Sequence, residues 1–122
     1  MPARQFTFPK SRRLTLSAEF EQVRKNGRAQ GGRLIVLSIV PANDATPFRA
    51  GFITSRALGR AVVRNRVRRR LREIVRKHQR EVVSGIWMVI IARANAARAS
   101  YEQLEVEWLR LAKRASILAT SC

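Results

Sequence analysis

The chain has 122 residues, of which 25 are Lys or Arg and only 8 are Asp or Glu, so its formal net charge is +17. A hydrophobic fraction of 46% is enough for a packed core and excludes a chain that is disordered throughout. The longest apolar runs, residues 34–40 and 86–92, are far shorter than the roughly 20 residues that span a bilayer, and no signal-peptide pattern follows the basic N-terminus. We therefore expect one cytoplasmic domain with a polyanionic partner.

The N-terminal part of the chain predicts an extended arm followed by a helix. Pro2 and Pro9 resist helix formation and residues 1–13 show no clear period, so an extended arm is expected there. The helix is expected to begin at Ser17, a good N-cap. It is expected to end at Gly27, because glycine suits the left-handed conformation that closes many helices.

Three or four strands are expected. Residues 33–40 and 49–54 are rich in β-branched side chains, and the turn signals at 41–47 predict that the two segments pair as a hairpin. Residues 27–30 give a shorter candidate strand before them. Residues 86–92 form a continuous apolar run, typical of a strand buried on both faces, so this strand should be central in the sheet.

The region after Gly59 changes to a helical period. Its apolar residues recur at steps of three and four, which places them in one arc of about 120° on a helix. That arc contains Val63, Val67, Leu71, Ile74, Val75 and His78. The remaining arc is almost wholly cationic and contains Arg66, Arg68, Arg69, Arg70, Arg72, Arg76, Lys77 and Arg80.

The start of this helix has two possible places. Arg64 falls inside the apolar arc, so either the helix begins near Asn65, which can cap it, or Arg64 lies in the first turn and reaches past the core. Both alternatives bring Arg64 and Arg66 close to the positive end of the helix dipole, where phosphate groups are favoured.

A cationic helix face is usually just a solvated surface, but such surfaces mix both signs of charge. Here one unbroken row at four-residue steps consists of Arg64, Arg68, Arg72, Arg76 and Arg80. Like charges at this spacing destabilise a helix by a few tenths of a kcal/mol per pair, roughly, unless a polyanion relieves them. Arginine also binds phosphate in a bidentate way and stacks on bases, so the row indicates nucleic-acid binding.

The last helix is predicted from its caps. Ser100 is an N-cap with Gln103 three residues later, and the carboxylates of Glu102, Glu105 and Glu107 are explained by the helix dipole. The order of helix, strands, helix, strand and helix gives the α+β class with a mixed sheet covered by helices.

The sequence offers no catalytic set. His78, the single histidine, lies on the apolar stripe and is interpreted as a packed or edge-of-core residue. No phosphate-binding glycine loop and no clustered metal ligands occur, and Cys122, the single cysteine, can form no internal disulfide. We predict no catalytic residues and no protein-bound metal.

The segment 61–73, AVVRNRVRRRLRE, resembles the signature of the bacterial ribonuclease P protein subunit, an Arg-Asn-Arg core followed by basic residues and Arg-Glu. The resemblance extends to FPKSRRL at 8–14, to RAGFITSR at 49–56 and to MVIIAR at 88–93. It also includes Glu19, Phe20, Gly27 and Gly59, and it covers nearly the whole chain.

The resemblance implies a single domain similar to the second domain of ribosomal protein S5, with a left-handed βαβ crossover. It also implies a function: the subunit joins a catalytic RNA, and the holoenzyme, an endoribonuclease, removes the 5′ leader of precursor tRNA. In that scheme RNA and its bound Mg²⁺ carry out the hydrolysis, and the protein holds no cofactor. The domain is placed at residues 14–116, with a tail at 117–122, and is expected to be monomeric apart from the RNA.

Two sets of site residues follow from the charge pattern and the resemblance. The residues expected to bind the catalytic RNA are Arg56, Arg60, Arg64, Asn65, Arg66, Arg68, Arg69, Arg72 and Arg76. The residues expected in a leader cleft between the first helix and the sheet are Phe20, Arg24, Leu34, Val36, Phe52, Thr54 and Ser55. Family members often place aromatic residues in this cleft, suited to stacking on bases, whereas this chain has Arg24, Leu34, Val36 and Leu37 there.

Two alternatives stay open. The chain could be a ribosomal-type RNA-binding protein with no part in processing, or a nuclease in its own right. The second is disfavoured because it would need a cluster of carboxylates or histidines to hold a metal ion.

Overall fold

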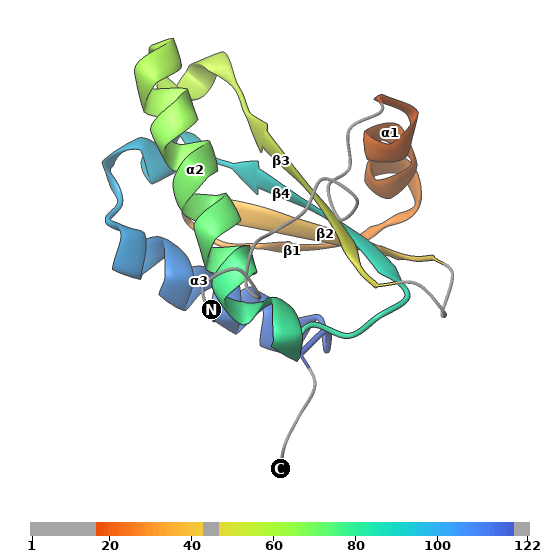
Figure 1. Ribbon diagram of the computed structural model, residues 1–122. Coiled ribbons are helices and arrows are strands. Elements are labelled where there is room, and N and C mark those ends of the chain that lie inside the picture. The colour runs from red at the N-terminus through yellow and green to blue at the C-terminus, as the bar shows by residue number, and fades with distance from the viewer. Residues whose placement is uncertain (1–16, 43–46, 119–122) are drawn as a thin grey trace, which may run out of the picture.

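The computed structural model describes residues 17–42 and 47–118, so the expected arm at 1–13 and Cys122 lie outside the described residues. In chain order, the elements are α1 (Ser17–Asn26), β1 (Arg28–Gly31), β2 (Ile35–Pro41), β3 (Arg49–Thr54), η3 (Arg56–Leu58), α2 (Ala61–His78), η4 (Gln79–Glu81), β4 (Ile86–Ala92), η5 (Ala94–Arg98) and α3 (Tyr101–Arg114) (Figure 1). The three η elements are single 3₁₀ turns or slightly longer. Within the described ranges, no helix is both long and apolar enough to cross a membrane.

The strands form one mixed sheet in the order β1-β2-β4-β3. β2 pairs antiparallel with β1 and with β4, whereas β3 pairs parallel with β4. The hairpin expected between residues 33–40 and 49–54 is therefore wrong, because β4 lies between these segments. The inner place predicted for β4 is confirmed, and its apolar residues are stable there because both faces of the sheet are covered. The short strand expected near 27–30 is confirmed as β1, which forms the actual hairpin with β2.

α2 connects the parallel strands β3 and β4. When these two strands are drawn pointing upward with α2 toward the viewer, β4 lies to the left of β3, so the crossover is left-handed (Figure 1). General rules favour the right-handed connection, and the expected exception is present. This connection sets α2 across the face of the sheet, in contact with β3.

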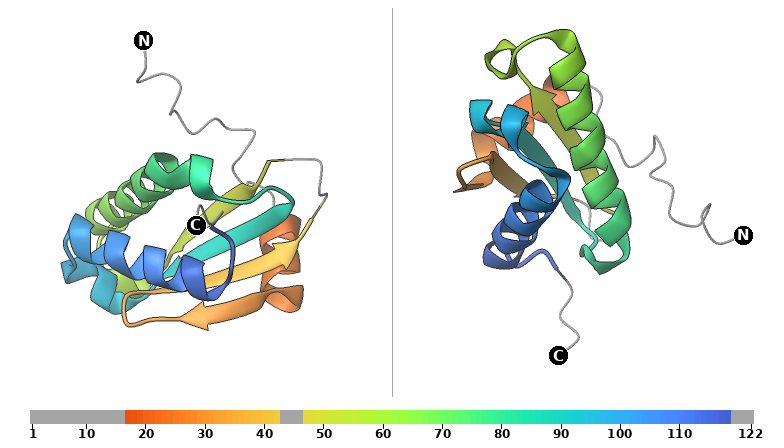
Figure 2. Two further views of the ribbon diagram at one scale, coloured as in Figure 1. Left: turned by 90° about the horizontal axis from the view of Figure 1, so that it is seen from below. Right: turned by 90° about the vertical axis from the view of Figure 1, so that its left-hand side faces the viewer.

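Helices cover both faces of the sheet (Figure 2). α2 and α3 lie on one face and enclose the main core, to which the strands contribute Ile35, Leu37, Ala50, Met88, Ile90 and Ala92, and Phe48 joins it from directly before β3. α1 lies on the opposite face over a smaller cluster of Val23, Val40 and Val89. Because side chains alternate along a strand, β2, β3 and β4 each contribute residues to both clusters.

The packed domain extends past the expected boundary at residue 116. Ile117 is 2% exposed, and its carbonyl accepts a hydrogen bond of 2.8 Å from the amide of Val83. Leu118 forms a β-bridge with Val82. Residues 117 and 118 therefore pack against one end of the main core.

Gly27 ends α1 for a reason other than the one expected. The positive-φ glycines of the described chain are Gly59 and Gly85, so the left-handed cap predicted at Gly27 is wrong. A Cβ atom at Gly27 would instead lie 2.3 Å from the carbonyl oxygen of Val23 and 2.8 Å from Oγ of Ser38. Glycine is needed here because the helix end presses directly against β2.

Candidate nucleic-acid interface

The chain turns sharply before α2. Ser55 caps η3 by accepting a hydrogen bond from the amide of Ala57 (3.3 Å), and Gly59 has a φ of 118°, which strongly favours glycine. α2 then begins at Ala61, with Arg60 at the N-cap position. The cationic helix thus starts directly at the end of β3.

Of the two alternatives for the start of α2, the structure has the second. Arg64 lies in the first turn, its amide bonded to the Arg60 carbonyl at 3.0 Å, and Asn65 lies inside the helix rather than capping it. The predicted apolar stripe is confirmed, since Val67, Leu71, Ile74 and Val75 are all fully buried. The stripe holds the helix so that the arginines project away from the main core.

Two of these arginines form hydrogen bonds that anchor the helix. Arg66 Nη2 donates to the carbonyl of Ala97 at 3.1 Å, and Arg70 Nη1 donates to the carbonyl of Ala99 at 2.9 Å. Both acceptors belong to the η5 region, which lies beside α2. Arg66 and Arg70 therefore join the edge of the cationic face to the start of α3.

Arg68 is held in a defined orientation on the opposite edge. Its Nη2 donates to Oγ1 of Thr54 at 2.6 Å, and its Nη1 donates to Oδ1 of Asn65 at 2.9 Å. Two neutral acceptors fix the guanidinium but leave its charge uncompensated, so it remains attractive to a phosphate. The geometry gives Asn65 and Thr54 a common role, which the sequence did not reveal because Thr54 is on another element.

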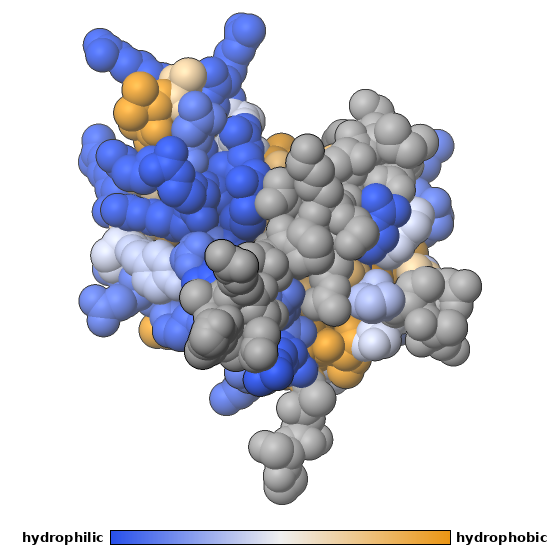
Figure 3. Space-filling model, viewed as in Figure 1, coloured by the Kyte–Doolittle hydropathy of each residue, from blue (hydrophilic) through white to orange (hydrophobic). Residues whose placement is uncertain are grey.

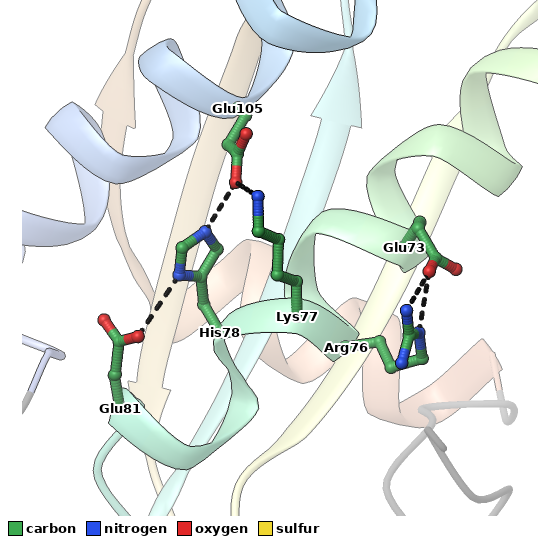
Figure 4. A network of polar contacts seen from close by, with 6 residues as sticks. All are labelled: Glu73, Arg76, Lys77, His78, Glu81 and Glu105. Carbon is green, nitrogen blue, oxygen red and sulfur yellow. Dashed lines mark hydrogen bonds and ion pairs between the residues drawn. The ribbon is translucent and has the colours of Figure 1, made fainter. Parts of the chain in front are cut away.

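The C-terminal part of the row is partly compensated. Glu73 pairs with Arg76, with Nε at 2.8 Å from the carboxylate (Figure 4). Arg72 and Arg80 also have interactions within the protein. The exposed positive charge is therefore concentrated toward the N-terminal half of α2, where Arg60, Arg66 and Arg69 are exposed.

The surface over α2 is correspondingly hydrophilic (Figure 3). Arg56 is exposed in η3, directly before the helix. Val62 stands out in the first turn because its side chain is 73% exposed. The residues predicted to bind RNA from Arg56 to Arg76 thus form one continuous surface on η3 and α2, which we name the arginine surface.

The residues predicted for the leader cleft are divided between the two faces of the sheet. Phe20 packs against the α1-side cluster, and Val36 faces that side because its neighbours Ile35 and Leu37 enter the main core. Leu34 and Phe52 pack against the main core instead. Thr54 faces α2 through Arg68, and Ser55 caps η3. The side chain of Arg24 lies outside the described residues.

The α1 side of the sheet gathers a different apolar set from the one expected. Ile53, Trp87 and Ile91 are half-buried and pack with Phe20 against the smaller cluster. Val36 is in register with Ile91, and Ile91 with Ile53, so these three form one cross-strand row. We name Phe20, Val36, Ile53 and Ile91 the α1-side apolar row. Sequence reasoning missed Ile53 and Ile91 because alternation along a strand does not show which of its two sets of side chains faces α1.

His78 occupies the edge of the main core, as interpreted from the sequence. Its side chain is 13% exposed and its ring is stacked on Trp108 at 5.8 Å between centroids. Nε2 lies 2.7 Å from Oε2 of Glu105, and Nδ1 lies 3.3 Å from Glu81 (Figure 4). Lys77 reaches the same Glu105 oxygen at 3.0 Å. Glu105 is thus more than a dipole-compensating residue, because it joins α3 to the end of α2.

This contact predicts a pH-dependent stability. The hydrogen bond from His78, assisted by Lys77 and opposed by partial burial, lowers the pKa of Glu105. Its stabilisation is therefore present above the ordinary pKa of a glutamate and is lost as the pH falls through the lowered folded-state value. Glu105→Gln should reduce the free energy of unfolding by roughly 1 kcal/mol at pH 7 and by much less at pH 3. Thermal unfolding of both proteins at each pH measures this, and an equal difference at pH 7 and pH 3 would contradict the assignment.

Glu107 is a buried carboxylate with a structural task. It is 7% exposed, and its Oε2 accepts hydrogen bonds from the amides of Leu34 at 2.7 Å and Ile35 at 2.8 Å. A Cβ atom at Gly32 would lie 2.5 Å from the same carboxylate, so glycine provides the space for it. The dipole explanation given from the sequence is incomplete, because Glu107 fastens α3 to the start of β2.

Within the described ranges, no three His, Cys, Asp or Glu residues come close enough together to hold a metal ion. The carboxylates of Glu105 and Glu107 already have basic or amide partners. These side chains do not fit a magnesium site, and what the arrangement offers chemically is binding of anions by oriented guanidinium groups.

Comparison with known proteins agrees with this arrangement. The family model described as Ribonuclease P matches residues 8–116. The ribonuclease P protein component of Syntrophomonas wolfei is 36% identical over 110 residues, covering 90% of this chain and 92% of the relative, and that of Symbiobacterium thermophilum is 38% identical over 109 residues, covering 89% and 95%. Solved ribonuclease P proteins superpose closely: that of Staphylococcus aureus has a TM-score of 0.83 at 27% identity, over 89% of this chain and 99% of the other. That of Thermotoga maritima has a TM-score of 0.76 at 26% identity, over 84% and 96%. A family match over most of its length, on a fold that carries the arginine surface on α2, shows that this chain belongs to the ribonuclease P protein family.

Proposed function

We propose that this protein is the RNA-binding subunit of ribonuclease P and that it docks on the catalytic RNA through the arginine surface. The observation that carries the proposal is the orientation of Arg68 by Thr54 and Asn65, which presents an uncompensated guanidinium beside the exposed Arg60, Arg66 and Arg69. Guanidinium groups held in this way suit bidentate contacts to phosphates.

The second part of the proposal concerns precursor tRNA. Its 5′ leader would lie on the other side of the sheet, on the α1-side apolar row. Phe20 is the aromatic member of that row, so it is the residue suited to stack on an unpaired base. The guanidinium carbon of Arg49 lies 5.6 Å from the centre of the Trp87 ring, so Arg49 adds a positive charge near the same face. From the expected cleft we retain Phe20, Arg24 and Val36, leave out Leu34, Phe52, Thr54 and Ser55, and add Ile53 and Ile91.

Hydrolysis is assigned to the RNA and to Mg²⁺ held by that RNA, with the protein supplying binding and orientation. The protein would then act in the cytoplasm, as a monomer on one RNA. The two alternatives predict different behaviour: a ribosomal-type protein would bind structured RNA without promoting leader removal, and a nuclease in its own right would cleave without the RNA.

Single-turnover cleavage of a precursor tRNA by the catalytic RNA at low Mg²⁺, with and without the protein and alongside protein alone, tests the proposal. We expect strong stimulation by the protein and no cleavage by the protein alone. A matched substrate that carries a one-nucleotide leader should lose most of the stimulation, because it cannot reach the α1-side apolar row. Tight RNA binding without stimulation would favour the ribosomal-type alternative.

A further inference from the structure

The face of the molecule around α3 contains a pocket that none of the roles above uses. It has a volume of about 610 Å³ and lies between the start of β2, η5 and the first half of α3. Pockets of about 300–1,000 Å³ are the usual size for a small bound group, so one nucleotide fits in it. Its apolar lining includes Leu34, Ala99 and Val106.

Val106 gives the pocket an unusual property. Its side chain is 66% exposed, although it lies on α3 between residues that pack into the protein. Together with the half-buried Leu34, it provides an apolar contact that a base or ribose can cover. The other residues that line the pocket are polar or charged, so a ligand that fits it must carry polar or charged groups as well as an apolar surface.

The charged lining favours an RNA partner. Arg33, Arg98 and Arg110 border the pocket, and of these Arg110 contacts Glu107 at 3.3 Å. Arg33 and Arg98 are exposed, and the side chain of neither has a hydrogen bond or an ion pair with another described residue. Glu102 also borders the pocket, and its carboxylate can accept a hydrogen bond from a ribose 2′-hydroxyl or an exocyclic amino group.

The position of the pocket indicates which RNA it meets. It is separated from the arginine surface only by η5, whose region accepts the hydrogen bonds of Arg66 and Arg70. The α1-side apolar row, by contrast, lies on the other face of the sheet. An RNA seated on α2 can pass over η5 into the pocket, whereas a leader on the α1 side would have to pass around the sheet.

We propose that this pocket binds an unpaired nucleotide of the catalytic RNA, with its base or ribose on Leu34 and Val106 and its phosphates on Arg33 and Arg98. The inference rests on the proposed function, since it assumes that the catalytic RNA occupies the arginine surface. It adds a second contact to that RNA, formed by α3 and η5 rather than by α2.

The test compares two double variants with the same loss of charge. The pocket variant, Arg33→Ala with Arg98→Ala, removes the two unpaired arginines that border the pocket. The control variant, Lys113→Ala with Arg114→Ala, removes two exposed cations at the far end of α3. Affinity for the catalytic RNA is measured over a range of salt concentrations, with unfolding curves to establish that both variants fold. The pocket variant should bind about tenfold more weakly than the control. The salt slope, which is the steepness with which log affinity falls with log salt concentration, should also be smaller than in the control by about 1.4. This is the loss expected for two phosphate contacts at roughly 0.7 per phosphate of single-stranded RNA.

A crosslinking experiment identifies the RNA. Replacing Cys122 by serine and Val106 by cysteine leaves one thiol at the pocket for a photoreactive label. In the complex with catalytic RNA and precursor tRNA, the label should attach to unpaired nucleotides of the catalytic RNA.

Attachment to the precursor tRNA, or equal affinities of the two double variants, would overturn the pocket assignment while leaving the arginine surface intact. Failure of the unaltered protein to bind the catalytic RNA would instead overturn the proposed function itself.

Discussion

Replacing Arg68 with alanine is expected to weaken binding to the catalytic RNA about tenfold and to lower the salt slope by about 0.9, as expected for one lost phosphate contact. Thr54 and Asn65 hold the Arg68 guanidinium in a defined orientation without compensating its charge. Because its acceptors are neutral, removing it leaves no unpaired buried charge, and folding should be unaffected. Arg114→Ala, which removes an exposed arginine at the end of α3, is the matched control and should change affinity little.

The same geometry distinguishes residues that position Arg68 from residues that contact the RNA. Asn65→Ala and Thr54→Val each remove one of the two hydrogen bonds that hold Arg68, and each should weaken binding about threefold to fivefold, less than Arg68→Ala, because the guanidinium keeps its charge. In the Arg68→Ala background, neither substitution should weaken binding further. If Asn65→Ala keeps its full effect in that background, Asn65 contacts the RNA directly and the positioning role is wrong.

The largest effect on stability is expected at Glu107. Glu107→Ala leaves the amides of Leu34 and Ile35 without an acceptor at the junction of β2 and α3. An unsatisfied buried donor costs about 1–3 kcal/mol, so the free energy of unfolding should fall by roughly 3–4 kcal/mol. That is a large share of the ~5–15 kcal/mol that stabilises a domain. Urea unfolding followed by circular dichroism measures the loss.

Two controls make the Glu107 result specific. Glu107→Gln keeps an acceptor oxygen and should lose only about 1 kcal/mol, because the change is from a charged to a neutral acceptor. Glu102→Ala removes an exposed glutamate from the same helix and should have a small effect. If Glu107→Ala were no more destabilising than Glu102→Ala, the fastening of α3 to β2 would be unimportant for stability.

The helices were predictable because their signals are local. Ser100 Oγ accepts from the amide of Gln103 at 3.1 Å, and the Gln103 side chain accepts from the amide of Ser100 at 2.9 Å, as the capping box predicts. The buried stripe of α2 was equally clear from its period. Where the helix prediction was left open, at Arg64 and Asn65, the start was decided by Gly59 and the end of β3.

The strands show the limit of this reasoning. Residues 33–40 and 49–54 are close in sequence and both are strand-like, yet β4 pairs with both of them from more than 30 residues away. Which strands pair depends on how the helices cover the two faces of the sheet, and that is decided only when the helices and the sheet pack together. The leader-cleft residues were misplaced for the same reason, since register decides the face on which each side chain lies.

The sequence alone determined the composition of the candidate interface: a helix with a buried stripe and an unbroken row of arginines at four-residue steps. These features depend on residues within four positions of one another and on net charge. The tertiary structure alone decided the partners: Thr54 for Arg68, the η5 carbonyls for Arg66 and Arg70, and the β2 amides for Glu107. Such contacts join residues far apart in the chain, and they form only once the sheet order and the left-handed crossover have fixed which elements meet.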